Sequence, residues 1–306
     1  MLLFIVKRFL WGIPVLLTVA TLTFAIMHIV PGGPFDKEKK LPPEIKANVE
    51  AKYHLDKPVH KQYILYLYGL IKGDLGPSYK YLGRDVRDII KDTFPVSIQL
   101  GFLSLLISII IGIGTGIISG IKSDTWWDRM TILFATTGIS LPNFILGAIL
   151  ILLFSHFYKI LPPALWEGWR YMILPSITLG FAPASYIARL TRSSVIDVMD
   201  KDYIRTARAK GLRGRNIVLK HVLKNSIMPV ITILGPITAA LVTGSFIVEY
   251  IFSIPGMGRF FVTAVTNRDY PLIMGVTLIY TVIIVLANVI VDILYTLLDP
   301  RVKIDT

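Results

Sequence analysis

The stretch Val96–Ile121 reads VSIQLGFLSLLISIIIGIGTGIISGI and contains no charged side chain. A helix needs about 20 consecutive apolar residues to cross the hydrocarbon core of a bilayer, so this stretch is long enough to span a membrane. Gly112, Gly116 and Gly120 recur at every fourth position within it. Small residues at this spacing share one helical face and let two helix backbones approach closely. The stretch therefore predicts a membrane helix packed tightly against a neighbour.

The chain contains several other apolar stretches of comparable length, so a single buried core helix does not explain the pattern. The six stretches are Phe9–Val30, Val96–Ile121, Thr131–Phe157, Met172–Ala188, Val230–Phe252 and Leu272–Leu298. Lipid offers no partner to backbone N–H and C=O groups, so membrane spans are helices or strands of a closed barrel. The strict alternation typical of barrel strands is absent here. The sequence predicts an all-α integral membrane protein, one transmembrane domain over residues 1–306 with six transmembrane helices.

The overall composition agrees with a membrane protein. Of 306 residues, 54% are hydrophobic and 17% charged, whereas about 25% are charged in a typical soluble domain. The mean hydropathy is +0.63. The chain has no cysteine, which excludes disulfides, thiolate metal sites and a cysteine nucleophile. The same reading predicts no metal site in the chain.

Basic residues in short loops set the predicted orientation, because Lys and Arg are enriched on the cytosolic side of membrane proteins. Lys7 and Arg8 precede the first span, and Arg301 and Lys303 follow the sixth. The segment 189–229 is also strongly basic. Its cations are Arg189, Arg192, Lys201, Arg205, Arg208, Lys210, Arg213, Arg215, Lys220 and Lys224. We expect a multi-pass membrane protein, with both termini and this segment in the cytosol. The net charge of +12 then reflects topology, and nucleic acid is not expected as a partner.

The loop 31–95 between the first two spans is expected to lie outside the cell, since loops of this length cross membranes largely regardless of charge. Ile45, Val49 and Tyr53 recur at a spacing of four, which predicts one helix. A second helix is predicted to begin after Pro58 and to end at Gly73. Two interpretations remain open for this loop, namely a cap on the membrane surface and a docking surface for an external partner.

Polar side chains within the spans are candidates for a wet pathway. The residues singled out are Ser140, Asn143, Thr243 and Glu249. Glu249 and Asp292 are acidic residues in apolar surroundings, and such residues normally face the protein interior or water. They belong either to a polar route or to hydrogen bonds between helices near an interface. Pro142, together with other prolines in the spans, is expected to kink its helix because proline lacks an N–H group.

The most distinctive part of the basic segment is predicted to be a short helix. Asp202 is expected to cap its start, and Gly211 is typical of a helix end. Ile204 and Ala207 fall on one face, which suits the shallow groove of a partner protein. The alternative is an amphipathic helix resting on anionic headgroups.

The sequence Arg205-Thr-Ala-Arg-Ala-Lys-Gly resembles the Glu-Ala-Ala loop of bacterial ATP-binding-cassette importer permeases, with Arg205 and Thr206 in place of the first two letters. The rest of the chain is similar to the oligopeptide and dipeptide branch of that family, most of all to the B-type transmembrane subunit of oligopeptide permeases. The shared motifs are Pro31-Gly-Gly-Pro, Lys52-Tyr-His-Leu-Asp, Gly73-Asp-Leu-Gly-Pro-Ser, Gly138-Ile-Ser-Leu-Pro-Asn-Phe, Ile254-Pro-Gly-Met-Gly, Asn267-Arg-Asp-Tyr-Pro and Leu298-Asp-Pro-Arg.

The resemblance implies a type I importer architecture and an import function for oligopeptides. It implies a homologous C-type permease as heterodimer partner, two cytosolic ATP-binding subunits, and an extracellular peptide-binding protein. The residues implied in coupling to the ATPases are Tyr203, Ile204, Arg205, Thr206, Ala207, Arg208, Ala209, Lys210, Gly211 and Leu212. ATP and Mg²⁺ are expected on the partner subunits, because the dipeptide Gly-Lys of a phosphate-binding loop does not occur in this chain. The chain itself is therefore not expected to be an enzyme or to bind a cofactor.

Two alternatives to oligopeptide import stay open. Within the same branch the cargo could be dipeptides, nickel chelates or oligosaccharides. The competing class is a stand-alone secondary carrier, which predicts inverted repeats and intramembrane coupling charges. No clear repeat is visible in the sequence. Co-purification with ATPase subunits distinguishes an importer from a carrier.

Overall fold

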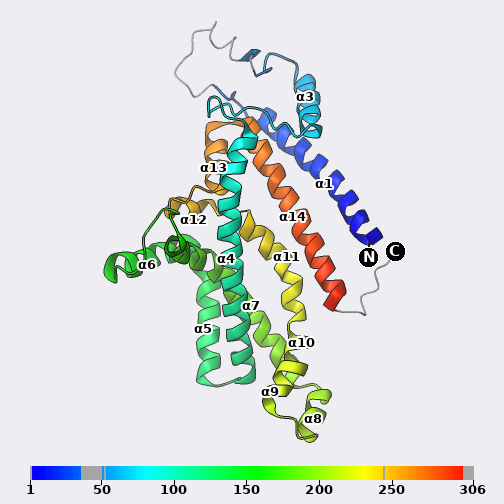
Figure 1. The fold of residues 1–306 in the computed structure, drawn as a ribbon, viewed down its shortest axis with the longest axis vertical. Coiled ribbons are helices and arrows are strands. Elements are labelled where there is room, and N and C mark those ends of the chain that lie inside the picture. Colours follow the sequence, from blue (N-terminus) through cyan, green and yellow to red (C-terminus); the bar gives the residue numbers. More distant parts are fainter. Residues whose placement is uncertain (1, 36–49, 52, 244, 299–306) are drawn as a thin grey trace.

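The computed structural model describes residues 2–35, 50–51, 53–243 and 245–298, with side chains undescribed at 2–5, 291–292 and 294–298. The predicted helix around Ile45 and Val49 lies outside the described residues. Asp292 lies on a described helix, but its side chain is outside the described set. All the long elements in the described part of the chain are helices (Figure 1).

Within the described residues, five helical segments are long and apolar enough to cross a membrane, and a bent pair makes a sixth if it is counted as one span. The five are α1 (Leu2–Ile29), α4 (Val86–Ile121), α7 (Trp169–Met199), α11 (Met228–Val242) with α12 (Phe246–Ile251), and α14 (Tyr270–Leu298). The predicted all-α membrane fold is confirmed. The helices extend beyond several predicted spans. For example, α4 has 36 residues and is roughly 54 Å long, more than a hydrocarbon core requires.

The predicted third span is not one helix. It consists of α5 (Trp126–Ser140), α6 (Asn143–Leu150) and the π-helix η1 (Ile151–Phe157), with a bend of 111° after α5. Proline disfavours helical conformation in the residue before it, and Leu141 before Pro142 is extended, with ψ 118°. Figure 1 shows α6 projecting sideways from the bundle. The chain therefore changes direction by 111° near Pro142, which is a larger bend than the helix kink that the sequence predicted.

The predicted fifth span is also broken. Helix α11 ends at Val242, and α12 begins at Phe246 with the Ser245 side chain accepting a hydrogen bond from the Val248 amide at 3.4 Å. A further helix, α13 (Met257–Asn267), lies between α12 and the last span. The sequence analysis assigned no helix to this segment.

The centre of the bundle is the pair α4 and α7, which share the most extensive helix–helix contact. A Cβ atom at Gly112 would lie 2.7 Å from the Ala184 carbonyl oxygen, and one at Gly116 would lie 2.6 Å from that of Ala188. Both distances are too short for a real side chain. The predicted close approach along the glycine repeat is confirmed, and its partner is α7.

The two ends of the bundle differ. At one end α3 (Val59–Ile71) packs over the ends of α1 and α14, and at the other end a short helix, α8 (Asp202–Ala209), closes the structure (Figure 1). The helix predicted after Pro58 is confirmed as α3. Near α3, the buried Asp269 carboxylate accepts hydrogen bonds from the Ser78 hydroxyl and the Tyr79 amide. Burial, together with the Asp269 charge, raises the pKa of Tyr79. This carboxylate pins the loop before α4 to the start of α14.

Gly116→Ala tests the helix seam. We expect it to lower the free energy of unfolding in detergent micelles by about 1–3 kcal/mol, because the added methyl group overpacks the contact with α7. Gly114→Ala is the matched control on the same helix, since a Cβ atom placed there would have no described atom within 4 Å. The control should be neutral or stabilising by up to about 1 kcal/mol. Equal stability of the two variants would contradict a backbone-to-backbone seam.

Candidate functional site

The predicted helical segment 203–212 is a helix at the end of the bundle opposite α3 (Figure 1). Helix α8 starts at Asp202, with Lys201 in the capping position and no side-chain hydrogen bond to the first turn. The expectation that Asp202 caps the helix was therefore wrong by one residue. Its carboxylate still lies in the first turn, where a negative charge stabilises the helix dipole.

The end of α8 is fixed by glycine. Gly211 has φ +74°, its amide donates to the Arg208 carbonyl at 2.9 Å, and the Leu212 amide donates to the Ala207 carbonyl at 3.3 Å. This pair of hydrogen bonds is the Schellman motif, which requires a left-handed residue at the first position after the cap. The chain therefore turns sharply at Gly211, so that α9 (Gly214–Ile217) can fold back toward the bundle.

The apolar face of α8 points inward. Ile204 is completely buried, Ala207 is 6% exposed, and both pack against Val195, Ile217 and Val222. The interpretation that Ile204 and Ala207 offer a shallow face to a partner was wrong, because the same chain already covers them. This apolar contact holds α8 against the end of α7.

The outward side of α8 is polar and basic. Its exposed residues are Tyr203, Arg205, Thr206, Arg208, Ala209 and Lys210, with Gly211 and Leu212 exposed at its end. The Tyr203 hydroxyl accepts a hydrogen bond from the Asn225 amide group at 3.1 Å, which ties α8 to α10 (Leu223–Ser226). After α8 the chain continues as α9, the π-helix η2 (Val218–Val222) and α10 in succession. The outward face of α8 therefore exposes small and positively charged side chains, while its inward face is packed against the bundle.

Three of the four predicted pathway residues lie at helix breaks. Ser140 and Asn143 flank the 111° bend between α5 and α6, and Thr243 caps α11 at its break from α12. Ser140 is exposed, and Asn143 and Thr243 are half-buried. Backbone groups at such breaks lack helical partners and are tolerated at membrane depth where they line a cavity or are buried in protein. These positions therefore place polar side chains at points where the regular helical backbone is interrupted.

Glu249 has a different role from the other three. It is completely buried and accepts hydrogen bonds from the Ser97 hydroxyl at 2.9 Å and the Arg259 amide at 3.0 Å. The Ser97 oxygen in turn accepts from the Met257 amide at 2.8 Å. Ser97 and Glu249 together satisfy the first N–H groups of α13, whose positive end favours a carboxylate. The geometry matches the hydrogen-bonding interpretation of Glu249 and not an exposed route.

This cap also gives a physical reason for the glycines in the motif Ile254-Pro-Gly-Met-Gly. A Cβ atom at Gly256 would lie 2.6 Å from the Glu249 carboxylate, and one at Gly258 would lie 3.0 Å from it. Any side chain at either position would push the carboxylate away. Sequence reasoning noted Glu249 and the motif separately, and Ser97 was missed because it lies far away in the chain.

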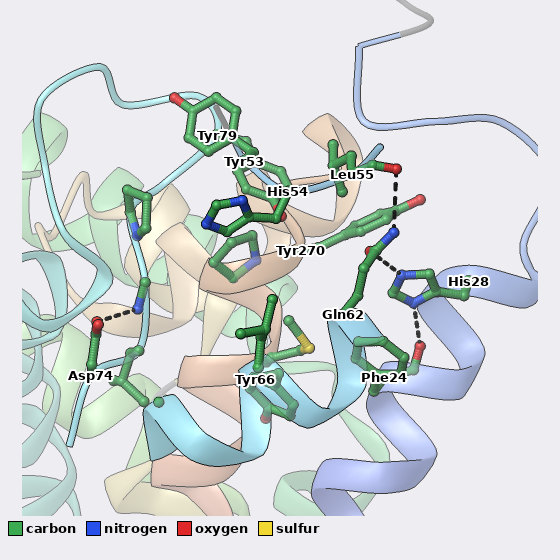
Figure 2. A pocket seen from close by; sticks show the side chains of 17 residues that line it. Phe24, His28, Tyr53, His54, Leu55, Gln62, Tyr66, Asp74, Tyr79 and Tyr270 are labelled. Carbon is green, nitrogen blue, oxygen red and sulfur yellow. Dashed lines mark hydrogen bonds between the residues drawn. The ribbon is translucent and has the colours of Figure 1, made fainter. Parts of the chain in front are cut away.

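A pocket of about 300 Å³ lies at the α3 end, between α1, α3, α14 and the loop after α3 (Figure 2). Its lining includes the aromatic side chains of Phe24, Tyr66, Tyr79 and Tyr270. The ring of His28 lies 2.8 Å from the Phe24 carbonyl oxygen and 3.1 Å from the Gln62 side-chain oxygen, so α3 is held on the end of α1. Burial raises the pKa of Tyr66. Among the described residues, no group of three His, Cys, Asp or Glu side chains is placed to hold a metal ion.

Comparison with known families identifies relatives along the chain. Residues 112–304 match the family model described as binding-protein-dependent transport system inner membrane component, and residues 1–101 match the model for the N-terminal part of such components. The dipeptide transport system permease protein DppB of Bacillus subtilis is 44% identical over 301 residues, 98% of each chain. The oligopeptide transport system permease protein OppB of Haemophilus influenzae is 43% identical over 305 residues, 99% of this chain and 100% of its own.

A third relative and one solved structure complete the comparison. The OppB protein of Escherichia coli K12 is 42% identical over 305 residues, 99% of this chain and 100% of its own. A chain from the crystal structure of an amino acid ABC transporter with histidines superposes with a TM-score of 0.53 and 14% identity, covering 68% of this chain and 94% of its own. At that identity the structural likeness supports the fold alone.

Gly211→Ala tests the turn at the end of α8. A non-glycine residue in the left-handed region costs roughly 1–2 kcal/mol, so we expect hydrogen exchange at residues 211 and 212 to accelerate by roughly five- to thirtyfold. Gly214→Ala is the control, because Gly214 also has open space at its Cβ position but no positive φ. Unchanged exchange in the Gly211 variant would show that the turn does not depend on glycine.

Ser97→Ala tests the buried hydrogen-bond network that joins Glu249 and Ser97 to the start of α13. Removing this hydroxyl leaves a buried carboxylate oxygen and the Met257 amide short of a partner, which should cost roughly 1–3 kcal/mol of unfolding free energy. Ser155→Ala is the control, since the buried Ser155 hydroxyl finds no hydrogen-bond partner within the described part of the chain. Thermal unfolding in detergent should separate the two variants. Equal melting temperatures for the two variants would show that Ser97 does not stabilise this hydrogen-bond network.

Proposed function

This chain belongs to the family of inner membrane components of binding-protein-dependent transport systems, and we propose that it is the membrane permease subunit of an ATP-binding-cassette importer for peptides. The observation that carries the proposal is the identity of 42–44% with dipeptide and oligopeptide permeases over nearly the whole chain. Relatives of both kinds are about equally similar. We therefore infer short peptides as the cargo class, in preference to nickel chelates or oligosaccharides.

The proposed complex has the composition that the sequence led us to expect. This chain pairs with a homologous C-type permease, two ATP-binding subunits lie in the cytosol, and a binding protein delivers peptide from outside. ATP and Mg²⁺ bind to the partner subunits, and this chain supplies the path and the mechanical contact. We place the α8 end in the cytosol, because the strongly basic segment belongs there by the positive-inside rule. The α3 end then faces the external binding protein.

Helix α8 is the proposed contact with an ATPase. Its outward residues are exposed, and its inward residues seat it on α7, so a push on the outer face moves α7 instead of deforming α8. The basic outer face fits an acidic surface on the partner. A headgroup-bound amphipathic helix fits less well, because the large apolar residue on the α8 face, Ile204, is completely buried and cannot enter lipid.

The proposed peptide path runs past the helix breaks. A peptide has unsatisfied amide groups and charged ends, so transfer across apolar surroundings is costly without hydrogen-bonding partners. Ser140, Asn143 and Thr243 offer such partners at the ends of helices, on surfaces that a second permease can face. Glu249 is omitted from this path, since its carboxylate is enclosed by Ser97 and α13.

The test uses the complete complex reconstituted in liposomes. Ala209→Trp places a bulky side chain on the outer face of α8 without disturbing its buried face, and we expect peptide-stimulated ATP hydrolysis and uptake to fall at least tenfold. Ser123→Trp, on the exposed turn between α4 and α5, is the control for bulk at the same end. Normal stimulation in the Ala209 variant rejects α8 as the contact. Peptide accumulation by liposomes that contain this chain alone rejects the importer and favours the secondary carrier.

A further inference from the structure

An ion pair between a buried carboxylate and a half-buried guanidinium joins three helices at the α8 end of the bundle. Asp128, in the first turn of α5, is 2% exposed. Arg192 of α7 donates to its two carboxylate oxygens at 2.5 Å and 2.8 Å. The Ser119 hydroxyl of α4 donates to one of these oxygens at 2.5 Å, and the Asp124 amide donates to the other at 2.9 Å. One carboxylate thus connects α4, α5 and α7, with two donors on each oxygen.

The ion pair lies directly beside the seat of α8. Val195, one helical turn after Arg192, packs against Ile204 and Ala207 of α8. A Cβ atom at Gly120 would lie 2.6 Å from Val195 and 3.0 Å from the Arg192 carbonyl oxygen, so the glycine seam of α4 ends at the same place. The turn of α7 from Arg192 to Val195 therefore contacts α8 on one side and holds α5 on the other.

The other end of α5 carries the proposed peptide path. From Asp128 the helix runs to Ser140, a distance of about 18 Å at 1.5 Å per residue, where the bend toward Asn143 begins. Helix α7 also packs against α5 nearer the bend, where Phe181 contacts Phe134 and Ser185 lies against Gly138. The ion pair adds a polar contact at the start of α5, so that both ends of α5 are held to α7. The bidentate contact of a planar guanidinium with a carboxylate fixes relative orientation as well as distance.

We propose that Asp128 and Arg192 are positioning residues for transport, and that their ion pair makes α5 follow α7 when α8 is displaced. The inference rests on the proposed function of α8. An ion pair removed from water contributes little net stability compared with well-packed apolar side chains. We therefore assign it the role of fixing the distance and orientation between α5 and α7. Breaking it disconnects ATP hydrolysis from the opening of the path, while the partners stay bound to an intact α8.

The test measures peptide imported per ATP hydrolysed by the complete complex in liposomes. Asp128→Asn keeps the side-chain shape and one oxygen acceptor but removes the charge, and the ratio should fall at least tenfold with ATPase subunits still co-purifying. Ser119→Ala removes only one of the four donors and should give a smaller loss, so it serves if the Asp128 variant does not fold. Arg129→Gln, which removes an exposed charge next to Asp128 on α5, should leave the ratio unchanged.

A distance measurement separates this role from a purely structural one. Because the chain has no cysteine, spin labels can be placed at Ile139→Cys on α5 and Ser193→Cys on α7. With the pair intact, the label distance should stay narrow and equal with and without ATP; in Asp128→Asn it should broaden or shift on ATP binding. A wild-type ratio with a narrow, constant distance in both the Asp128 and the Ser119 variants overturns the proposal. Failure of the unsubstituted chain to co-purify with ATPases instead rejects the proposed function.

Discussion

The close packing of α4 against α7 is the contact on which the rest of the structure depends. Three glycines in four-residue steps leave three successive turns of α4 without a side chain on one face, so that its backbone meets the carbonyl oxygens and side chains of α7. In lipid there is little hydrophobic force between helices, and close van der Waals contact between small residues replaces it. Because this seam continues to Gly120 at the α8 end, it also positions Ser119 for the Asp128 carboxylate and Val195 for the seat of α8.

Membership in the fold class was readable from the sequence, but the paths of two spans were not. Hydropathy measures how many apolar residues follow one another and does not record direction. The stretches around Pro142 and Thr243 are apolar enough to read as single helices, yet the first bends by 111° and the second consists of two helices, α11 and α12. Pro142 did predict a local kink, since it lacks an N–H group. A bend of 111° also needs neighbours that satisfy the freed backbone, and those neighbours come from distant parts of the chain.

The site residues also fall into two groups: those that local sequence rules predict, and those whose environment depends on distant residues. The helix at 202–209 and its end at Gly211 follow from local rules, because a positive φ and a Schellman motif depend on one glycine. Which face of that helix is free depends on Val195 and Val222, and no local pattern reveals that packing. Glu249 was visible as an acid in apolar surroundings, but its partner Ser97 lies 152 residues away. The aromatic pocket under α3 likewise combines α1, α3 and α14.

Three buried carboxylates mark rigid points in the described part of the molecule. Asp128 holds the start of α5, Glu249 holds the start of α13, and Asp269 holds the start of α14, each through donors from separate segments. A buried carboxylate without such donors is costly, so every one of these junctions resists separation. The breaks at Ser140 and at Thr243 lie between the junctions and have no comparable anchor among the described residues. Under the proposed coupling through α8, we therefore expect the two breaks, where polar side chains lie, to change conformation more readily than the anchored junctions.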